Sequence, residues 1–106
     1  MAREIYKLHA EVCQTLSSPK RLEILDLLSG GEKSVSELAE LTGMIPSNVS
    51  QHLAILRGRG LVTTRREGTN IYYRIANPKI IQACNLIREV LLERLEEAAE
   101  LVRSME

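Results

Sequence analysis

The chain has 106 residues, of which 44% are hydrophobic and 26% charged, and its acidic and basic side chains are equal in number. This length allows one core, so we expect residues 1–106 to form a single domain. No apolar run approaches the ~18 residues that a membrane-spanning helix needs, and the N-terminal segment is amphipathic rather than signal-like. We therefore expect a cytoplasmic protein with no membrane partner.

The N-terminal part of the chain shows the periodicity of two amphipathic helices. Apolar residues spaced by threes and fours predict the first helix over roughly 4–16. Ser18 followed by Pro19 is the pattern of an N-cap and a first helical position. It predicts a second helix that ends before Gly30.

Two shorter helices follow, separated by only a few residues. Ser34, with Glu37 three residues later, has the pattern of a capping box and begins a third helix that ends at Gly43. Pro46 suits the first position of a fourth helix, which we expect over roughly 46–58.

After the fourth helix the period of the pattern changes from about 3.6 to about 2 residues, as expected for strands. The β-branched and alternating segments 62–66 (VTTRR) and 71–75 (IYYRI) predict the two strands of a hairpin. Gly68 between them suits the first central position of a type II′ turn, which requires a positive φ.

The last segment predicts a helix whose apolar stripe is too long for one small domain to bury. After Pro78, apolar side chains recur every three or four residues as far as Val102. Together with the stripe of the first helix, this surface is the natural contact of a homodimer. The expected interface residues are Ile5, Leu8, Val12, Ile80, Cys84, Ile87, Leu91 and Leu95.

These elements predict a mainly α-helical fold with a small β-hairpin: five helices and a two-stranded wing in a winged helix-turn-helix arrangement. In that arrangement the helix at 46–58 enters the major groove of DNA. The first residues of this helix are uncharged side chains that can form hydrogen bonds with base edges, and Asn or Gln can pair with adenine through two hydrogen bonds. The expected base contacts are Ser47, Asn48, Ser50, Gln51 and His52.

Basic residues concentrate in the middle of the chain. Residues 44–76 carry five arginines and one glutamate, a net charge of +4, whereas the flanking segments each carry −2. A basic block between acidic helical regions favours a surface that meets DNA phosphates, the alternative being a chance cluster of solvated arginines. Neighbours on a strand face opposite ways, so Arg65 and Arg66 should not both reach DNA. The expected backbone and groove contacts are Lys20, Arg21, Arg57, Arg65, Arg66, Thr69 and Asn70.

Three segments, LSSPKRLEILDLL, SVSELAELTGMIPSNVSQHLAILRGRGLV and TRREGTNIYYRI, resemble the signature of the ArsR/SmtB family of dimeric winged-helix repressors. The match is close over residues 12–76, and the terminal helices lie where that family has its dimer contacts. The resemblance implies a repressor that binds double-stranded DNA as a homodimer, at a partly palindromic operator, and is released by a ligand.

The positions of that family's metal ligands are mostly occupied by other residues. Its Cys-x-Cys pair corresponds to Ser34 and Ser36, which are poor ligands for a soft metal. Its site on the last helix retains one ligand in four, too few for zinc. These four positions are Asn77, Lys79, Val90 and Glu93. We therefore expect neither a metal nor another cofactor.

Three residues remain as candidates for a signal-sensing site. His9 and Cys13 share one face of the first helix, and Cys84 lies on the helix that should pack against it. Both cysteines could be small packing residues, ligands of a metal or metalloid, or a redox pair. The identity of the effector stays open.

Two other classes of function compete with DNA recognition. A winged helix can contact another protein without binding DNA specifically, and the zero net charge permits this. The amide-rich start of the fourth helix disfavours it, because protein contacts usually rely on aromatic or aliphatic anchors. The sequence shows neither a nucleophile–base arrangement nor a phosphate loop, so we expect no catalysis.

Overall fold

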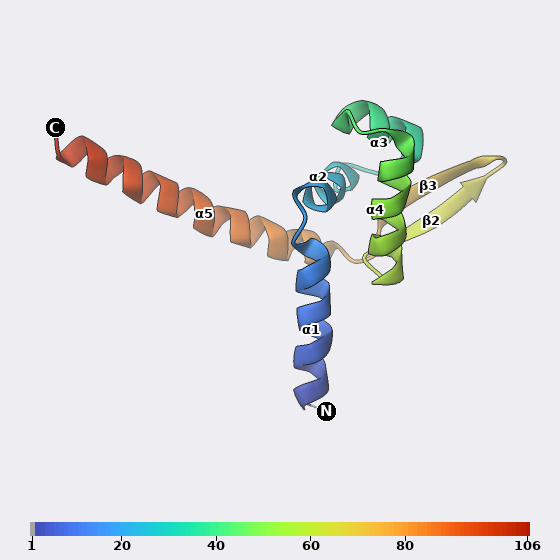
Figure 1. The fold of residues 1–106 in the computed structure, drawn as a ribbon, viewed down its shortest axis with the longest axis horizontal. Helices are drawn as coiled ribbons and strands as arrows, with labels where there is room; N and C mark the ends of the chain where they lie inside the picture. Colours follow the sequence, from blue (N-terminus) through green and yellow to red (C-terminus); the bar gives the residue numbers. More distant parts are fainter. Residues whose placement is uncertain (1) are drawn as a thin grey trace.

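The computed structural model describes residues 2–106, which form five helices and three strands (Figure 1). The elements in chain order are α1 (Ala2–Leu16), α2 (Pro19–Leu28), β1 (Lys33–Ser34), α3 (Val35–Thr42), α4 (Pro46–Gly58), β2 (Val62–Glu67), β3 (Asn70–Ile75) and α5 (Pro78–Ser104). The five predicted helices and the hairpin are confirmed in type and order.

The prediction of a two-stranded sheet is wrong, because a third strand, β1, pairs with the hairpin. The strand order is β1-β3-β2, and both pairings are antiparallel. Lys33 lies opposite Tyr73, and Ser34 lies opposite Tyr72. A strand of two residues is too short to show an alternating pattern, which is why the sequence did not reveal it. It joins the wing to the segment that leads into α3.

Side-chain caps begin α2, α3 and α5, and the first two of these caps are the ones that the sequence predicts. Ser18 caps α2 by accepting a hydrogen bond from the backbone N–H of Arg21. Ser34 and Glu37 form both hydrogen bonds of the capping box at the start of α3. Asn77 caps α5 through its side-chain oxygen. These contacts satisfy backbone N–H groups that have no partner within their own helix.

The hairpin closes in a two-residue turn at Gly68 and Thr69, between the paired residues Glu67 and Asn70. Gly68 has a φ of 62°. Among residues 2–106 only glycines have positive φ, so φ of Thr69 is negative. This combination excludes a type I′ turn and fits the predicted type II′ turn.

The core lies where α2, α3 and α4 meet one another and the base of the sheet. Its buried side chains are all aliphatic, as expected for a chain without Phe or Trp. They are Ile24, Leu25, Leu28, Leu38, Val49, Leu53, Leu56, Leu61 and Val62. Tyr73 and Ile75 pack against this cluster from β3, so the wing is fixed to the same core as α4.

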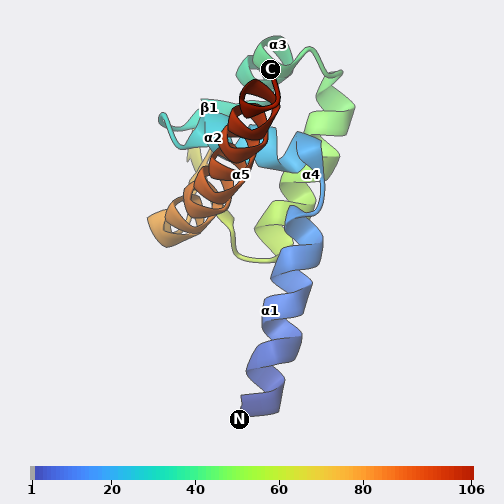
Figure 2. The ribbon, with the colours of Figure 1, turned by 90° about the vertical axis from the view of Figure 1, so that its left-hand side faces the viewer.

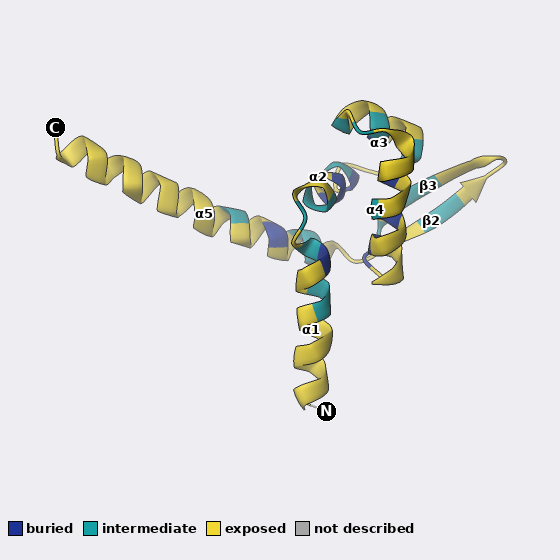
Figure 3. Ribbon diagram, in the orientation of Figure 1, coloured by how far each residue is buried: buried dark blue, intermediate teal, exposed yellow. Residues whose placement is uncertain are grey.

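The first and last helices extend away from this body as two arms (Figures 1 and 2). The radius of gyration is 17.0 Å, against about 13 Å for a compact domain of this length. Most of both arms is exposed (Figure 3), and Cys84 is the only buried residue of α5. Among residues 2–106, no helix combines the length and apolarity needed to cross a membrane.

Ser34→Ala should lower the free energy of unfolding by about 1 kcal/mol, because it removes the side-chain half of the capping box. Ser36→Ala is the matched control, since Ser36 is exposed in the same helical turn and outside the capping box. Urea denaturation at one fixed protein concentration measures both variants. Equal stability of the two variants would contradict the capping role.

Candidate nucleic-acid interface

The first half of α4 exposes polar side chains because its apolar side chains are directed into the core. Val49, Leu53 and Leu56 are fully buried at the spacing that places residues on one face of a helix. The other residues from Pro46 to Ile55 are exposed, except for the half-buried His52 (Figure 3). The predicted base contacts Ser47, Asn48, Ser50 and Gln51 belong to this exposed set.

The connection between α3 and α4 keeps the start of α4 open. Gly43 ends α3 with a φ of 75°, a conformation that favours glycine. Ile45 occupies the N-cap of α4 and forms no side-chain capping hydrogen bond there. The partial positive charge of this helix end is therefore available to an anion such as a DNA phosphate.

Arg21 and His52 join the start of α2 to the middle of α4. The Nε of Arg21 donates a hydrogen bond to the carbonyl of Thr15 at 2.6 Å, and its Nη1 lies 3.4 Å from Nδ1 of His52. Desolvation of the imidazole, together with the charges of Arg21 and Lys20, lowers the pKa of His52. A neutral ring can both donate and accept hydrogen bonds, as base recognition requires.

The two adjacent arginines of the wing have different surroundings. Arg65 forms ion pairs with Glu32 and Glu67 and lies over the ring of Tyr72. Arg66 is exposed and forms no ion pair with any residue in the described range 2–106. The prediction that the two side chains face opposite ways agrees with this difference, and Arg66 is the one with free hydrogen-bond donors.

The other predicted DNA contacts are exposed at the rim of this surface. Thr69 and Asn70 lie at the tip of the hairpin, and Arg57 lies in the last turn of α4. Lys20 is exposed at the start of α2, 3.9 Å from the carboxylate of Glu23. The hairpin packs beside α4 and extends away from the body in the direction opposite to α5 (Figures 1 and 2).

Five of the eight predicted dimer residues are exposed on the two arms, with relative exposures of 51–66%. They are Ile5, Leu8, Ile87, Leu91 and Leu95. The other three turn toward their own body: Val12 and Ile80 pack against the core, and Cys84 is buried. Further apolar residues of the arms are exposed in addition to the expected interface residues, namely Tyr6, Leu86, Val90, Leu92, Leu101 and Val102.

Cys13 and Cys84 line one cavity of about 410 Å³ at the junction of α1, α2 and α5. The other lining residues are mainly aliphatic, among them Leu16, Leu22 and Ile87. His9 is exposed and does not line this cavity. The structure thus brings the two thiols to one apolar site and leaves the imidazole outside it. Among residues 2–106 no three His, Cys, Asp or Glu side chains gather as metal ligands would.

The arrangement of α3, α4 and the hairpin defines a winged helix-turn-helix protein. Residues 18–64 match the family described as "Bacterial regulatory protein, arsR family". This segment contains the predicted helix pair and the first residues of the wing. Together with 38% identity to an HTH-type transcriptional regulator over 95% of this chain, the match shows that the chain belongs to the arsR family of bacterial regulatory proteins.

Relatives of this chain are named as regulators rather than enzymes. Rv0081 of Mycobacterium tuberculosis, an HTH-type transcriptional regulator, is 38% identical over 102 residues, which are 95% of this chain and 90% of that protein. Rv0324 of the same organism is 42% identical over 90 residues, or 85% of this chain, but the chain spans only 40% of its length. The biofilm growth-associated repressor of Xylella fastidiosa is 36% identical over 89 residues, 84% of this chain and 78% of that repressor.

Two solved structures are similar to this one over nearly the whole chain. The crystal structure of Rv0081 has a TM-score of 0.81 and 41% identity, and the match covers 90% of this chain and 96% of that one. The homodimeric winged helix-turn-helix DNA-binding domain of Mb0332 from Mycobacterium bovis has a TM-score of 0.80 and 40% identity, covering 88% and 86%. These similarities favour a DNA-binding regulator over a winged helix that contacts only proteins.

The pKa of His52 should lie below the ordinary histidine value of 6.5, because burial desolvates the ring and because Arg21 and Lys20 place positive charge near it. Arg21→Gln should raise this pKa by removing a nearby positive charge, whereas Arg21→Lys, which keeps the charge, should raise it less. NMR titration of the His52 ring measures all three proteins. A midpoint at or above 6.5 in the unmutated chain would contradict the predicted environment.

Proposed function

We propose that the chain is a homodimeric transcriptional repressor that binds a partly palindromic DNA operator through α4 and the wing. The observation that carries the proposal is the exposed, uncharged and polar start of α4, held in one orientation by three fully buried side chains and flanked by the basic wing. The regulator would act on DNA in the cytoplasm.

In this proposal Ser47, Gln51 and His52 contact base edges in the major groove. Amide and hydroxyl groups suit this role because they can match the donors and acceptors of a base pair without a strong attraction to every phosphate. Asn48 and Ser50 are also exposed on the same half of α4 and would add contacts at the edge of the groove.

Basic and polar residues around α4 would hold the DNA backbone. Such contacts fix the position of the protein on the duplex and carry no direct sequence information. Arg66, Thr69 and Asn70 come from the wing, and Arg57 comes from the end of α4. Lys20 and Arg21 come from α2, where Arg21 also supports His52.

The homodimer is supported by the apolar side chains that the arms leave exposed. Eleven exposed large apolar residues lie on α1 and α5, namely Ile5, Tyr6, Leu8, Leu86, Ile87, Val90, Leu91, Leu92, Leu95, Leu101 and Val102. A stripe of this extent favours burial against another chain. The related domain of Mb0332 is itself described as homodimeric.

Relief of repression would require an element that can pack in two ways and thereby change the separation of the two α4 helices. We assign this role to the joint between α1 and α5, because it contains the cavity lined by Cys13 and Cys84. A ligand or an oxidation that repacks this joint would alter the geometry of both halves of the dimer together.

The first experiment selects duplexes from a randomised DNA pool with the unmutated chain. We expect two related half-sites about one helical turn, roughly 34 Å, apart. Gln51→Ala should then weaken discrimination against base-substituted duplexes by about 1–3 kcal/mol. Gln82→Ala is the matched control, because it removes an exposed amide from α5. Recovery of a single asymmetric half-site, or unchanged discrimination in Gln51→Ala, would contradict the proposed recognition.

Ile87→Glu should dissociate or unfold the dimer, because it puts an unpaired charge into an apolar contact. Glu89→Lys is the matched control: it also changes a charge on α5, but about 200° around the helix from Ile87. Sedimentation equilibrium and circular dichroism measure association and folding. A stable, folded monomer of the unmutated chain at micromolar concentration would contradict the proposed dimer.

A further inference from the structure

The guanidinium of Arg65 is engaged on three sides. Its Nε lies 3.1 and 3.2 Å from the two carboxylate oxygens of Glu32, to which its Nη2 also donates. Its Nη1 donates to Glu67 at 2.9 Å. The centre of the guanidinium lies 4.9 Å from the ring centroid of Tyr72. This two-donor contact with one carboxylate fixes direction as well as charge.

This side chain spans the sheet from one edge to the other. Arg65 on β2 lies opposite Tyr72 on β3, and Tyr72 lies opposite Ser34 on β1. Residues that lie opposite one another share a face of the sheet, so these three form a row. Glu32 directly precedes β1, and Ser34 is the N-cap of α3. The Arg65–Glu32 pair therefore connects the wing to the entry of the helix-turn-helix.

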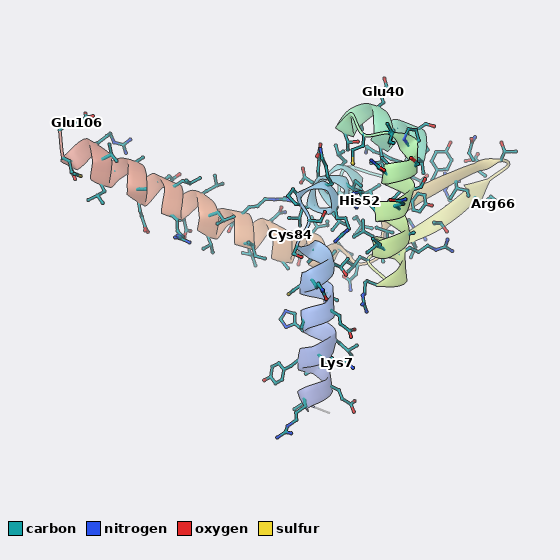
Figure 4. The ribbon with its side chains drawn as sticks, in the orientation of Figure 1. Lys7, Glu40, His52, Arg66, Cys84 and Glu106 are labelled. Carbon is teal, nitrogen blue, oxygen red and sulfur yellow. The ribbon has the colours of Figure 1, made fainter. Side chains whose placement is uncertain are left out.

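Arg66 belongs to the opposite face, because side chains alternate along a strand. Val62 and Thr64 share its face, and Val62 is buried in the core that also holds α4. Farther along the same strand, Arg66 extends beyond the core and is exposed (Figure 4). It thus lies on the side of the wing that packs toward the recognition helix, whereas Arg65 lies on the other side.

We propose that Arg65 is a positioning residue: paired with Glu32, it sets the angle of the wing against the helix-turn-helix, so that Arg66 on the other face reaches a DNA phosphate. The inference rests on the proposed function and assigns different roles to the two neighbouring arginines. Hydrogen bonding from Arg65 lowers the pKa of Glu32, so the pair remains charged at neutral pH. Both side chains are partly exposed, and such a pair contributes more to orientation than to stability.

The first test exchanges the two charges of the pair. Affinity is measured for a duplex selected from a randomised pool by the unmutated chain. Arg65→Glu should weaken binding at least about tenfold, the equivalent of one ordinary charged contact. The double variant Glu32→Arg with Arg65→Glu should restore affinity to within about threefold, because it re-forms the pair with the same net charge. If the double variant binds as weakly as Arg65→Glu, Arg65 contacts DNA itself and the inference is wrong.

The second test asks whether Arg65 acts through Arg66. Arg65→Met and Arg66→Met should each weaken binding, and the loss in the double variant should be clearly smaller than the product of the two single losses, because part of the effect of Arg65→Met is the misplacement of Arg66. Losses that multiply would mean two independent contacts and would overturn the inference. Thermal unfolding by circular dichroism identifies any variant whose loss reflects misfolding, and such a variant is replaced by Arg65→Gln or Arg66→Gln. If the unmutated chain selects no duplex, the proposed function fails, and this inference fails with it.

Discussion

The burial of one row of aliphatic side chains on α4 determines how the rest of the molecule can act. Val49, Leu53 and Leu56 are fully buried, and a helix anchored at this spacing cannot rotate about its axis without exposing apolar surface. The polar residues of the first half of α4, which are Ser47, Asn48, Ser50 and Gln51, are consequently held outward. The same core fixes the hairpin through Val62 and Tyr73, so α4 and the wing share one support.

Local patterns in the sequence correctly predicted the five helices, the hairpin and the exposure of most of the polar residues on α4 and the wing. The capping box of Ser34 and Glu37 depends only on residues within one helical turn, and the positive φ of Gly68 depends only on the two-residue hairpin turn. Their roles therefore follow from spacing alone. Spacing did not predict the strand β1 or the ion pair between Arg65 and Glu32. Each depends on a partner about 30–40 residues away, Tyr73 for Lys33 and Glu32 for Arg65, and no local pattern records such a pairing.

The exposed helices α1 and α5 show that an apolar pattern does not tell which surface will cover it. An apolar stripe indicates which face of a helix is buried, but it does not distinguish burial within the chain from burial against another chain. Cys84 and Ile87 belong to one stripe of α5, yet Cys84 is buried in its own body and Ile87 is 60% exposed. The difference arises from where α5 leaves the body. In the proposed dimer, folding of the arms and association of the chains would be a single process.

The wing and α5 extend from the body in opposite directions (Figure 1) and belong to segments of opposite charge, although the net charge of the chain is zero. Segment 44–76, which contains α4 and the hairpin, carries a net charge of +4, whereas segment 77–106, most of which is α5, carries −2. In the proposed function, a polyanion would attract the first segment and repel the second, and the resulting torque would turn the wing of each protomer toward the duplex before contact. Screening limits this torque to separations of about 8–10 Å at physiological salt. The zero net charge would then limit indiscriminate attraction to nucleic acid, while the unequal segments would still bring the proposed binding surface to DNA first.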